Sequence, residues 1–135
     1  MIAKPLTPKL SVASQMTTTD VQEAANQGFT VIINNRPDNE ESGQPMASEI
    51  EAIAHKLGIQ YIHQPVVGSN ITANDITAFA KLIEDTPGKL LAHCRTGTRC
   101  TMLWALSQKG KQSADDILAR AKTAGYELEQ LRDRL

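Results

Sequence analysis

Residues 89–100 read KLLAHCRTGTRC and bring together side chains that could do chemistry on an anion. A short apolar run ends at His93, and Cys94 then opens a loop of small residues that contains Gly97 and ends at Arg99. If the run is a strand and a helix follows the loop, backbone N–H groups and the positive helix end point inward. Gly97 permits a close turn, and Arg99 adds a forked cation that suits oxyanions. The pattern is typical of an anion-binding loop.

The same electrostatic field acts on the thiol of Cys94. A cysteine pKa of about 8.5 falls to about 3.5–7.5 at a helix N-terminus beside cations, so Cys94 is predicted to be a nucleophilic thiolate. The alternative is a small buried hydrophobic residue, as most free cysteines are. Thr96 and Thr98 are candidate anion-binding residues. Arg95 is expected either to contact the ligand or to remain solvated. We expect His93 to orient the loop rather than to transfer protons.

The elements that would position this loop alternate along the chain. Apolar runs predict strands at 9–14, 29–35, 59–67 and 89–93. Helical patterns predict helices at 19–28, where Thr19 and Gln22 have capping-box spacing, and then at 46–57, 72–86, 98–110, 113–124 and 126–135. The alternation predicts an α/β fold in which helices flank a mostly parallel sheet of about four or five strands. In such a sheet Cys94 lies at the carboxyl end of a strand, where ligands bind.

Composition excludes several classes of protein. The 135 residues suit a single domain, 1–135, that buries about two thirds of its unfolded surface. With 14 basic and 15 acidic residues, the chain is expected to bind neither nucleic acid nor a membrane surface. It shows no apolar leader or membrane span, so we expect a cytoplasmic protein with reduced thiols. The three histidines have no ligand spacing, so neither a metal nor another cofactor is expected.

Four segments together resemble a known family. They are LSVASQ, GFTVIINNRPDNEESGQP, YIHQPVVG and HCRTGTR, and they are similar to the bacterial beta-lactamase-hydrolase-like, phosphatase-like domain family. That family is similar in fold to dual-specificity protein phosphatases. The resemblance implies that Cys94 attacks phosphorus, that Arg99 and the loop amides hold the phosphoryl oxygens, and that a thiophosphate intermediate is then hydrolysed.

The chain departs from the phosphatase signature in its active loop. Only four residues separate Cys94 from Arg99, one fewer than in that signature, and the short loop looks like that of rhodaneses, which carry a cysteine persulfide. Cys100 follows where the signature has a hydroxyl. We expect Cys100 to pack in the first helical turn, with a reversible Cys94–Cys100 disulfide, or sulfur passage to Cys100, as the alternative.

The segment that would carry the general acid of these phosphatases reads PVVGSN and has no carboxylate. Asp38, in the loop after the second strand, could supply this acid from a neighbouring strand end, and Arg36 beside it could bind the same anion or only cap the strand. We expect Asp75 to serve only in the first turn of its helix.

Three functions therefore remain open. The first is a cysteine-dependent phosphatase-like hydrolase of a phosphate monoester, and the second is a rhodanese-type sulfurtransferase that carries a persulfide on Cys94. The third is a catalytically quiet anion sensor or thiol switch. The expected partner is a small anionic substrate or a phosphorylated or persulfidated protein.

Overall fold

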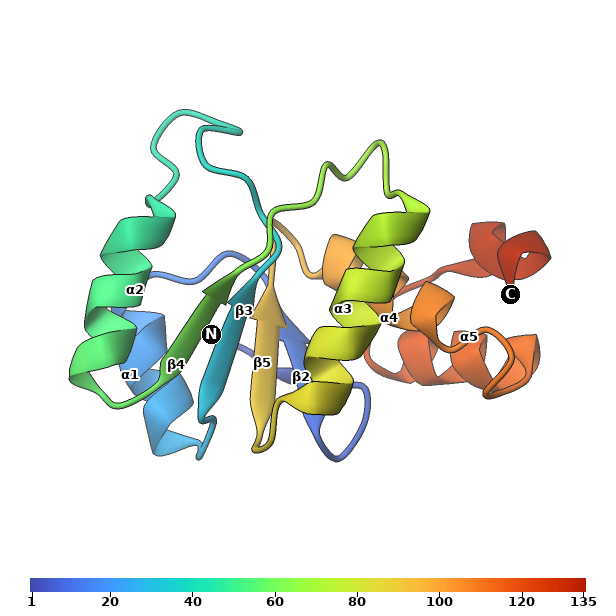
Figure 1. Cartoon of the computed structure of the whole chain (residues 1–135), viewed down its shortest axis with the longest axis horizontal. Coiled ribbons are helices and arrows are strands. Elements are labelled where there is room, and N and C mark those ends of the chain that lie inside the picture. Colours follow the sequence, from blue (N-terminus) through green and yellow to red (C-terminus); the bar gives the residue numbers. More distant parts are fainter.

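A five-stranded sheet lies at the centre of the molecule (Figure 1). The computed structural model describes residues 1–135. The strands follow the order β1-β2-β5-β3-β4. They are β1 (Lys4–Pro5), β2 (Leu10–Ala13), β5 (Leu90–His93), β3 (Val31–Asn34) and β4 (Gln60–His63). Only β1 runs antiparallel to its neighbour, so the predicted mostly parallel sheet is confirmed.

Helices cover both faces of this sheet (Figure 1). One face carries α1 (Thr18–Asn26) and α2 (Ala47–Lys56). The other carries α3 (Ala73–Asp85) and α4 (Thr98–Ser107), with α5 (Ala114–Thr123) and the short 3-10 helix η1 (Glu129–Arg134) beyond them. The α/β architecture inferred from the alternation of elements is therefore confirmed.

The central strands are apolar on both sides because each side faces a helical layer. Ile32 and Leu91 pack with α1 and α2 in one core, whereas Ile33 and Leu90 pack with α3 and α4 in the other. All four side chains are buried. Strand β5 lies between β2 and β3, so the segment that leads to Cys94 is held on both edges and both faces.

Three local features differ from the sequence-based expectations. The capping box of α1 is formed by Thr17 and Asp20 rather than by Thr19 and Gln22, because Thr17 is the residue that still has extended backbone. The segment expected to be a helix from residue 126 forms the 3-10 helix η1, and β1 was not predicted. By contrast, Thr72 and Asp75 form the capping box of α3, which confirms the role expected for Asp75.

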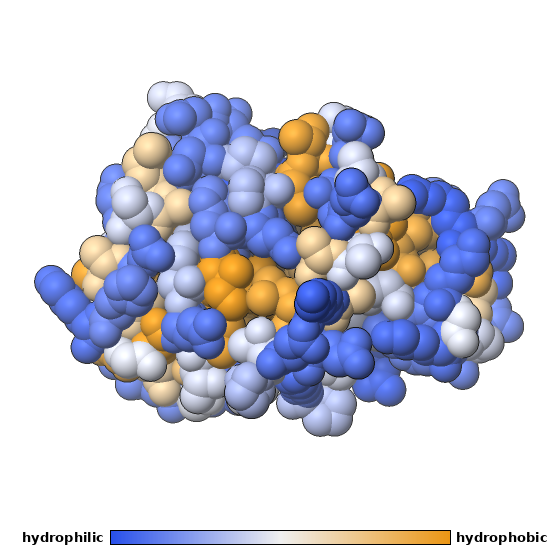
Figure 2. Space-filling view, viewed as in Figure 1, coloured by the Kyte–Doolittle hydropathy of each residue, from blue (hydrophilic) through white to orange (hydrophobic).

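The surface in the same view is largely hydrophilic, with an apolar area near its middle (Figure 2). None of the helices combines the length and apolar character needed to span a membrane.

Candidate active site

The site forms where the parallel strands end. The last residues of the four parallel strands are aligned across the sheet. They are Ala13 of β2, His93 of β5, Asn34 of β3 and His63 of β4. The loops that follow these strands therefore emerge together at the carboxyl end of the sheet, which lies at the top of Figure 1. Two backbone bonds tie them together, from Asn35 N to His93 O (2.9 Å) and from Val66 N to Asn35 O (2.9 Å).

The loop after β5 curls around the sulfur of Cys94. Helix α4 begins at Thr98, and its N-cap is Gly97, whose φ of 91° is in the left-handed region that favours glycine. The turn directs the Gly97 N–H to Cys94 Sγ at 3.2 Å. Backbone N–H groups of Thr96 and Cys100 also lower the pKa of this thiol.

These donors ionise Cys94. The Cys100 thiol contributes most, and despite the opposing effect of burial the donors together lower the pKa of Cys94 to about 5. Burial and the neighbouring Cys94 raise the pKa of Cys100, so Cys100 stays protonated and donates its S–H. Both cysteines are free thiols. Cys100 occupies the first turn of α4, as expected, and its thiol also lowers the pKa of Cys94.

Cys94 is buried and lines a cavity of about 260 Å³. Its walls include five residues of the loop that the sequence pointed to and two others. They are Cys94, Arg95, Thr96, Thr98 and Arg99, together with Gly68 and Met102. The structure therefore brings the predicted loop residues together, with Gly97 bonded to the sulfur behind them. No carboxylate or histidine is among the lining residues, and no cluster of His, Cys, Asp or Glu could hold a metal ion.

Arg99 is fixed on the rim of this cavity. Its Nη1 donates to Glu40 Oε2 (3.1 Å) and Val66 O (2.9 Å), and its Nη2 donates to Glu40 Oε1 (3.2 Å). A Cβ on Gly68 would lie 3.0 Å from Arg99 Nε, so glycine gives the guanidinium room to lie there. The Nε–H and one Nη2–H have no protein acceptor, and these are the donors that Arg99 can offer to an anion.

Arg36 lies below the site and is not free to bind an anion. It is 1% exposed, and its guanidinium donates to Glu40 (2.8 Å), Glu41 (3.0 Å) and Gln15 (3.1 Å). All three nitrogens of the guanidinium have protein acceptors, so the structure gives no support to the alternative in which Arg36 binds the substrate anion. Its role is to hold Glu40, which in turn holds Arg99.

Asp38 also lies elsewhere than predicted. Its Oδ1 accepts from Ala47 N at 2.8 Å, so the carboxylate caps the first residue of α2. It is absent from the lining of the cavity that contains Cys94. The structure therefore does not place Asp38 at the cavity, where the sequence suggested that it could act as a general acid. The long loop between β3 and α2 uses this carboxylate to begin a helix.

His93 is fully buried, and burial lowers its pKa to about 4. The ring is therefore neutral near pH 7 and is shielded from the cavity. This agrees with a structural role next to Cys94 rather than with proton transfer.

Tyr126 supports the loop from behind and was not predicted from the sequence. Its hydroxyl donates to Thr96 O at 3.0 Å, and a Cβ on Gly97 would lie 2.0 Å from that hydroxyl. Glycine is therefore needed at position 97 for space as well as for its φ. Glu40 and Glu41 were also missed, although the four-residue spacing of Arg36 and Glu40 was a visible signal. Nothing local indicated Tyr126, which is distant in the chain.

A family model described as "Beta-lactamase hydrolase-like protein, phosphatase-like domain" matches residues 3–111. A beta-lactamase hydrolase-like protein of Xylella fastidiosa (strain Temecula1) is 38% identical over 122 residues, which are 89% of this chain and 28% of that protein. The chain thus spans less than a third of the length of this relative.

Solved structures of phosphatases also match this chain. The crystal structure of a candidate phosphatase from Neisseria meningitidis Z2491 is 37% identical, has a TM-score of 0.90 and matches 97% of this chain and 94% of its own. The core catalytic domain of a PP-IP phosphatase from S. cerevisiae is 15% identical, with a TM-score of 0.74 over 98% of this chain and 81% of that one. At that identity the match concerns the fold, which is the one shared by protein-tyrosine and dual-specificity phosphatases.

We expect Glu40→Gln to lower the free energy of unfolding by about 2 kcal/mol, because it leaves the buried Arg36 charge poorly paired. Glu41→Gln is the matched control. It removes a more exposed partner of Arg36 and should cost less than about 1 kcal/mol. Urea denaturation measures both, and equal small losses would contradict a buried Arg36–Glu40 pair.

The loss of stability caused by Glu40→Gln should depend on pH. Although burial raises the pKa of Glu40, hydrogen bonds from Arg99 and Arg36 lower it below the ordinary 4.5. The contribution of a carboxyl whose pKa is lowered by folding is present above the unfolded pKa and is lost as pH falls through the folded pKa. The stability difference between wild type and Glu40→Gln should therefore shrink only below about pH 4.5.

Replacing Cys100 tests its effect on the ionisation of Cys94. We expect Cys100→Ala to raise the pKa of Cys94, so that alkylation of Cys94 by iodoacetamide near pH 6 slows about tenfold. Cys100→Ser keeps a donor and should retain the wild-type rate. If the two variants react alike, the Cys100 thiol does not stabilise the thiolate.

Proposed function

Since the chain belongs to the phosphatase-like domain family of beta-lactamase hydrolase-like proteins, we propose that it is a phosphatase whose nucleophile is Cys94. The observation that carries the proposal is a sulfur held as thiolate by inward N–H groups on the floor of a cavity rimmed by Arg99 and Arg95. A phosphoryl group that enters the cavity meets a nucleophile, two cations and the donors of a helix N-terminus together.

The first chemical step is attack of the Cys94 thiolate on phosphorus. The S–P bond forms as the bond from phosphorus to the leaving oxygen breaks, and the leaving group departs with that electron pair. Arg99 can donate its two free N–H groups to the phosphoryl oxygens. Arg95 pairs with Glu41 at 3.4 Å on the surface, a weak contact that it can exchange for substrate.

In the second step water attacks the phosphorus of the thiophosphate. The S–P bond breaks, inorganic phosphate leaves and the thiolate of Cys94 is restored. The bonds from Gly97 N–H and the Cys100 thiol stabilise the departing thiolate, so the interactions that lower its pKa also make it a good leaving group.

The cavity wall points to a substrate class. It contains no carboxyl group that could protonate a departing oxygen. Glu40 and Glu41 are the carboxylates next to the site, and both are held by arginines. We therefore propose that the enzyme acts on phosphates whose leaving group needs little protonation, namely aryl phosphates and phosphoanhydrides, rather than on alkyl phosphates.

Sulfur transfer is the second candidate function. The same observation favours it, because passage of sulfane sulfur from a persulfide on Cys94 to an acceptor thiolate needs no acid for an oxygen leaving group. The loop donors would hold the persulfide as they hold the thiolate.

One pair of assays separates these functions. We expect the wild-type chain to hydrolyse p-nitrophenyl phosphate, and Cys94→Ser to lose activity by about 10³-fold or more because the nucleophile is gone. Cys100→Ser is the matched control and should stay active. In parallel, transfer of sulfur from thiosulfate to cyanide should remain at the level of the Cys94→Ser blank. Sulfur transfer without hydrolysis would favour the second candidate over the phosphatase. If neither activity is detected, the function that remains is that of an anion sensor or thiol switch.

The substrate class predicts a steep dependence on the leaving group. A general acid is typically worth about 10²–10⁴ in rate for a poor leaving group, and this cavity offers none. Across substituted phenyl phosphates, kcat/KM should fall strongly as the pKa of the phenol rises, and an alkyl phosphate should be close to inert. A shallow dependence would mean that a proton donor reaches the leaving oxygen.

A further inference from the structure

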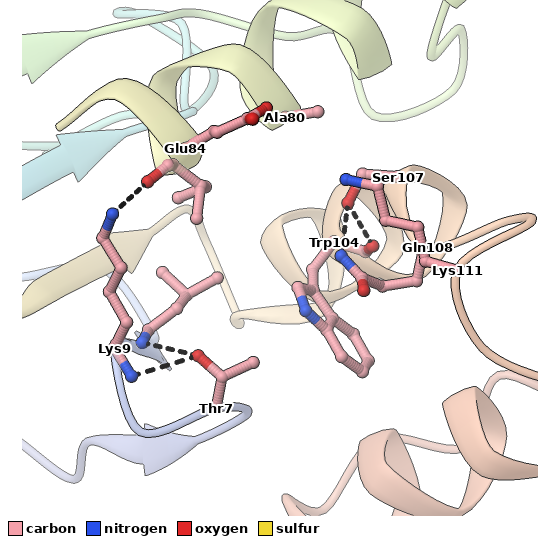
Figure 3. Close-up of a pocket in the computed structure, with 10 residues that line it drawn as sticks. Thr7, Lys9, Ala80, Glu84, Trp104, Ser107, Gln108 and Lys111 are labelled. Carbon is pink, nitrogen blue, oxygen red and sulfur yellow. Dashed lines mark hydrogen bonds between the residues drawn. The ribbon is translucent and has the colours of Figure 1, made fainter.

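A second cavity of about 210 Å³ (Figure 3) lies at the end of the sheet where β2 begins, whereas Cys94 lies at the end where the parallel strands stop. It is enclosed by the turn that precedes β2, by the C-terminal half of α3 and by the C-terminal half of α4. Strand β2 begins at Leu10, a lining residue, whereas Cys94 follows the last residue of β5. The two cavities have no lining residue in common.

The wall of this cavity contains a buried donor that has no acceptor within the protein. Trp104 is 2% exposed, and its indole Nε1 makes no hydrogen bond to any protein atom. An indole N–H can only donate, so it is satisfied only by an acceptor that enters from the cavity. Figure 3 shows the Trp104 ring projecting from α4 into the space across from Thr7 and Lys9.

Other polar groups of the wall also have hydrogens to donate. Thr7 Oγ1 accepts from the backbone N–H groups of Lys9 (3.2 Å) and Leu10 (2.9 Å), which leaves its hydroxyl hydrogen available. Lys9 Nζ donates to Ile83 O at 2.5 Å and keeps two further hydrogens. The wall is therefore rich in donors near the indole.

The charge and the apolar surface of the lining limit the class of ligand that this cavity can bind. The lining contains two cations, Lys9 and Lys111, and one carboxylate, that of the exposed Glu84, so it carries a net positive charge. Leu10, Ile83 and the indole ring supply apolar surface. The cavity has no arginine and no glycine-rich turn of backbone N–H groups, the features that suit phosphate in the Cys94 loop.

We propose that this cavity binds a small organic carboxylate. Its oxygens accept from the Trp104 indole N–H, the Thr7 hydroxyl and the Lys9 ammonium, and its hydrocarbon part packs on Leu10 and the indole ring. This site is independent of the phosphatase chemistry proposed above.

The test uses benzoate as the probe and the intact 135-residue chain. Trp104 is the single tryptophan, so its indole N–H gives one unambiguous cross-peak in a ¹H–¹⁵N spectrum. Benzoate should shift this cross-peak in a saturable way, and Lys9→Gln should weaken the affinity about tenfold by removing a charged donor. Inorganic phosphate should shift the amides of the Cys94 loop and leave the indole in place.

Two comparisons keep the result specific. Benzyl alcohol, which is neutral and similar in shape, should bind at least about tenfold more weakly than benzoate. Trp104→Phe keeps the apolar surface without the donor, and benzoate binding to it, followed by saturation-transfer NMR on the ligand, should be lost or much weaker. No saturable shift with benzoate, equal shifts with benzyl alcohol, or unchanged binding to Lys9→Gln would each overturn the proposal.

Discussion

The interaction on which the site depends is the hydrogen bonding of backbone N–H groups to one sulfur atom where a strand becomes a helix. Strand β5 is packed on both edges and both faces, so it delivers Cys94 to a fixed point. The left-handed turn at Gly97 then directs an N–H back to the sulfur while α4 begins. The Cys100 thiol in the first turn of α4 completes the set of donors. A buried thiolate is tolerated because each of these groups is already oriented toward it.

A second layer of charge holds the cations around that sulfur. Three arginines meet two glutamates of the loop between β3 and α2: Glu40 joins Arg36 to Arg99, and Glu41 joins Arg36 to Arg95. Because Arg36 is buried, this network is anchored in the body of the protein rather than at its surface. It fixes Arg99 beside the cavity without using all of its donors, so the guanidinium is ready for an anion.

Sequence reasoning located the loop around Cys94 because its signals are local. The apolar run that ends at His93, the glycine three residues after Cys94 and the following helix all lie within one short segment. It did not anticipate the partners of Arg36 and Asp38, because these are set by the folding of a long loop. Arg36 pairs with Glu40 and Glu41, and Asp38 accepts a hydrogen bond at the N-terminus of α2. Contacts between distant segments, such as Tyr126 with Thr96, leave no local pattern.

The ionisation of Cys94 is the claim most directly open to measurement. With ¹³C-labelled cysteine, the Cβ resonance of Cys94, assigned with Cys94→Ser, can be followed against pH in the intact chain. The donor set predicts a titration midpoint near pH 5, with Cys100 silent over the same range. A midpoint near the ordinary thiol value of about 8.5 would mean that the loop does not hold a thiolate, and the nucleophile proposed here would be lost.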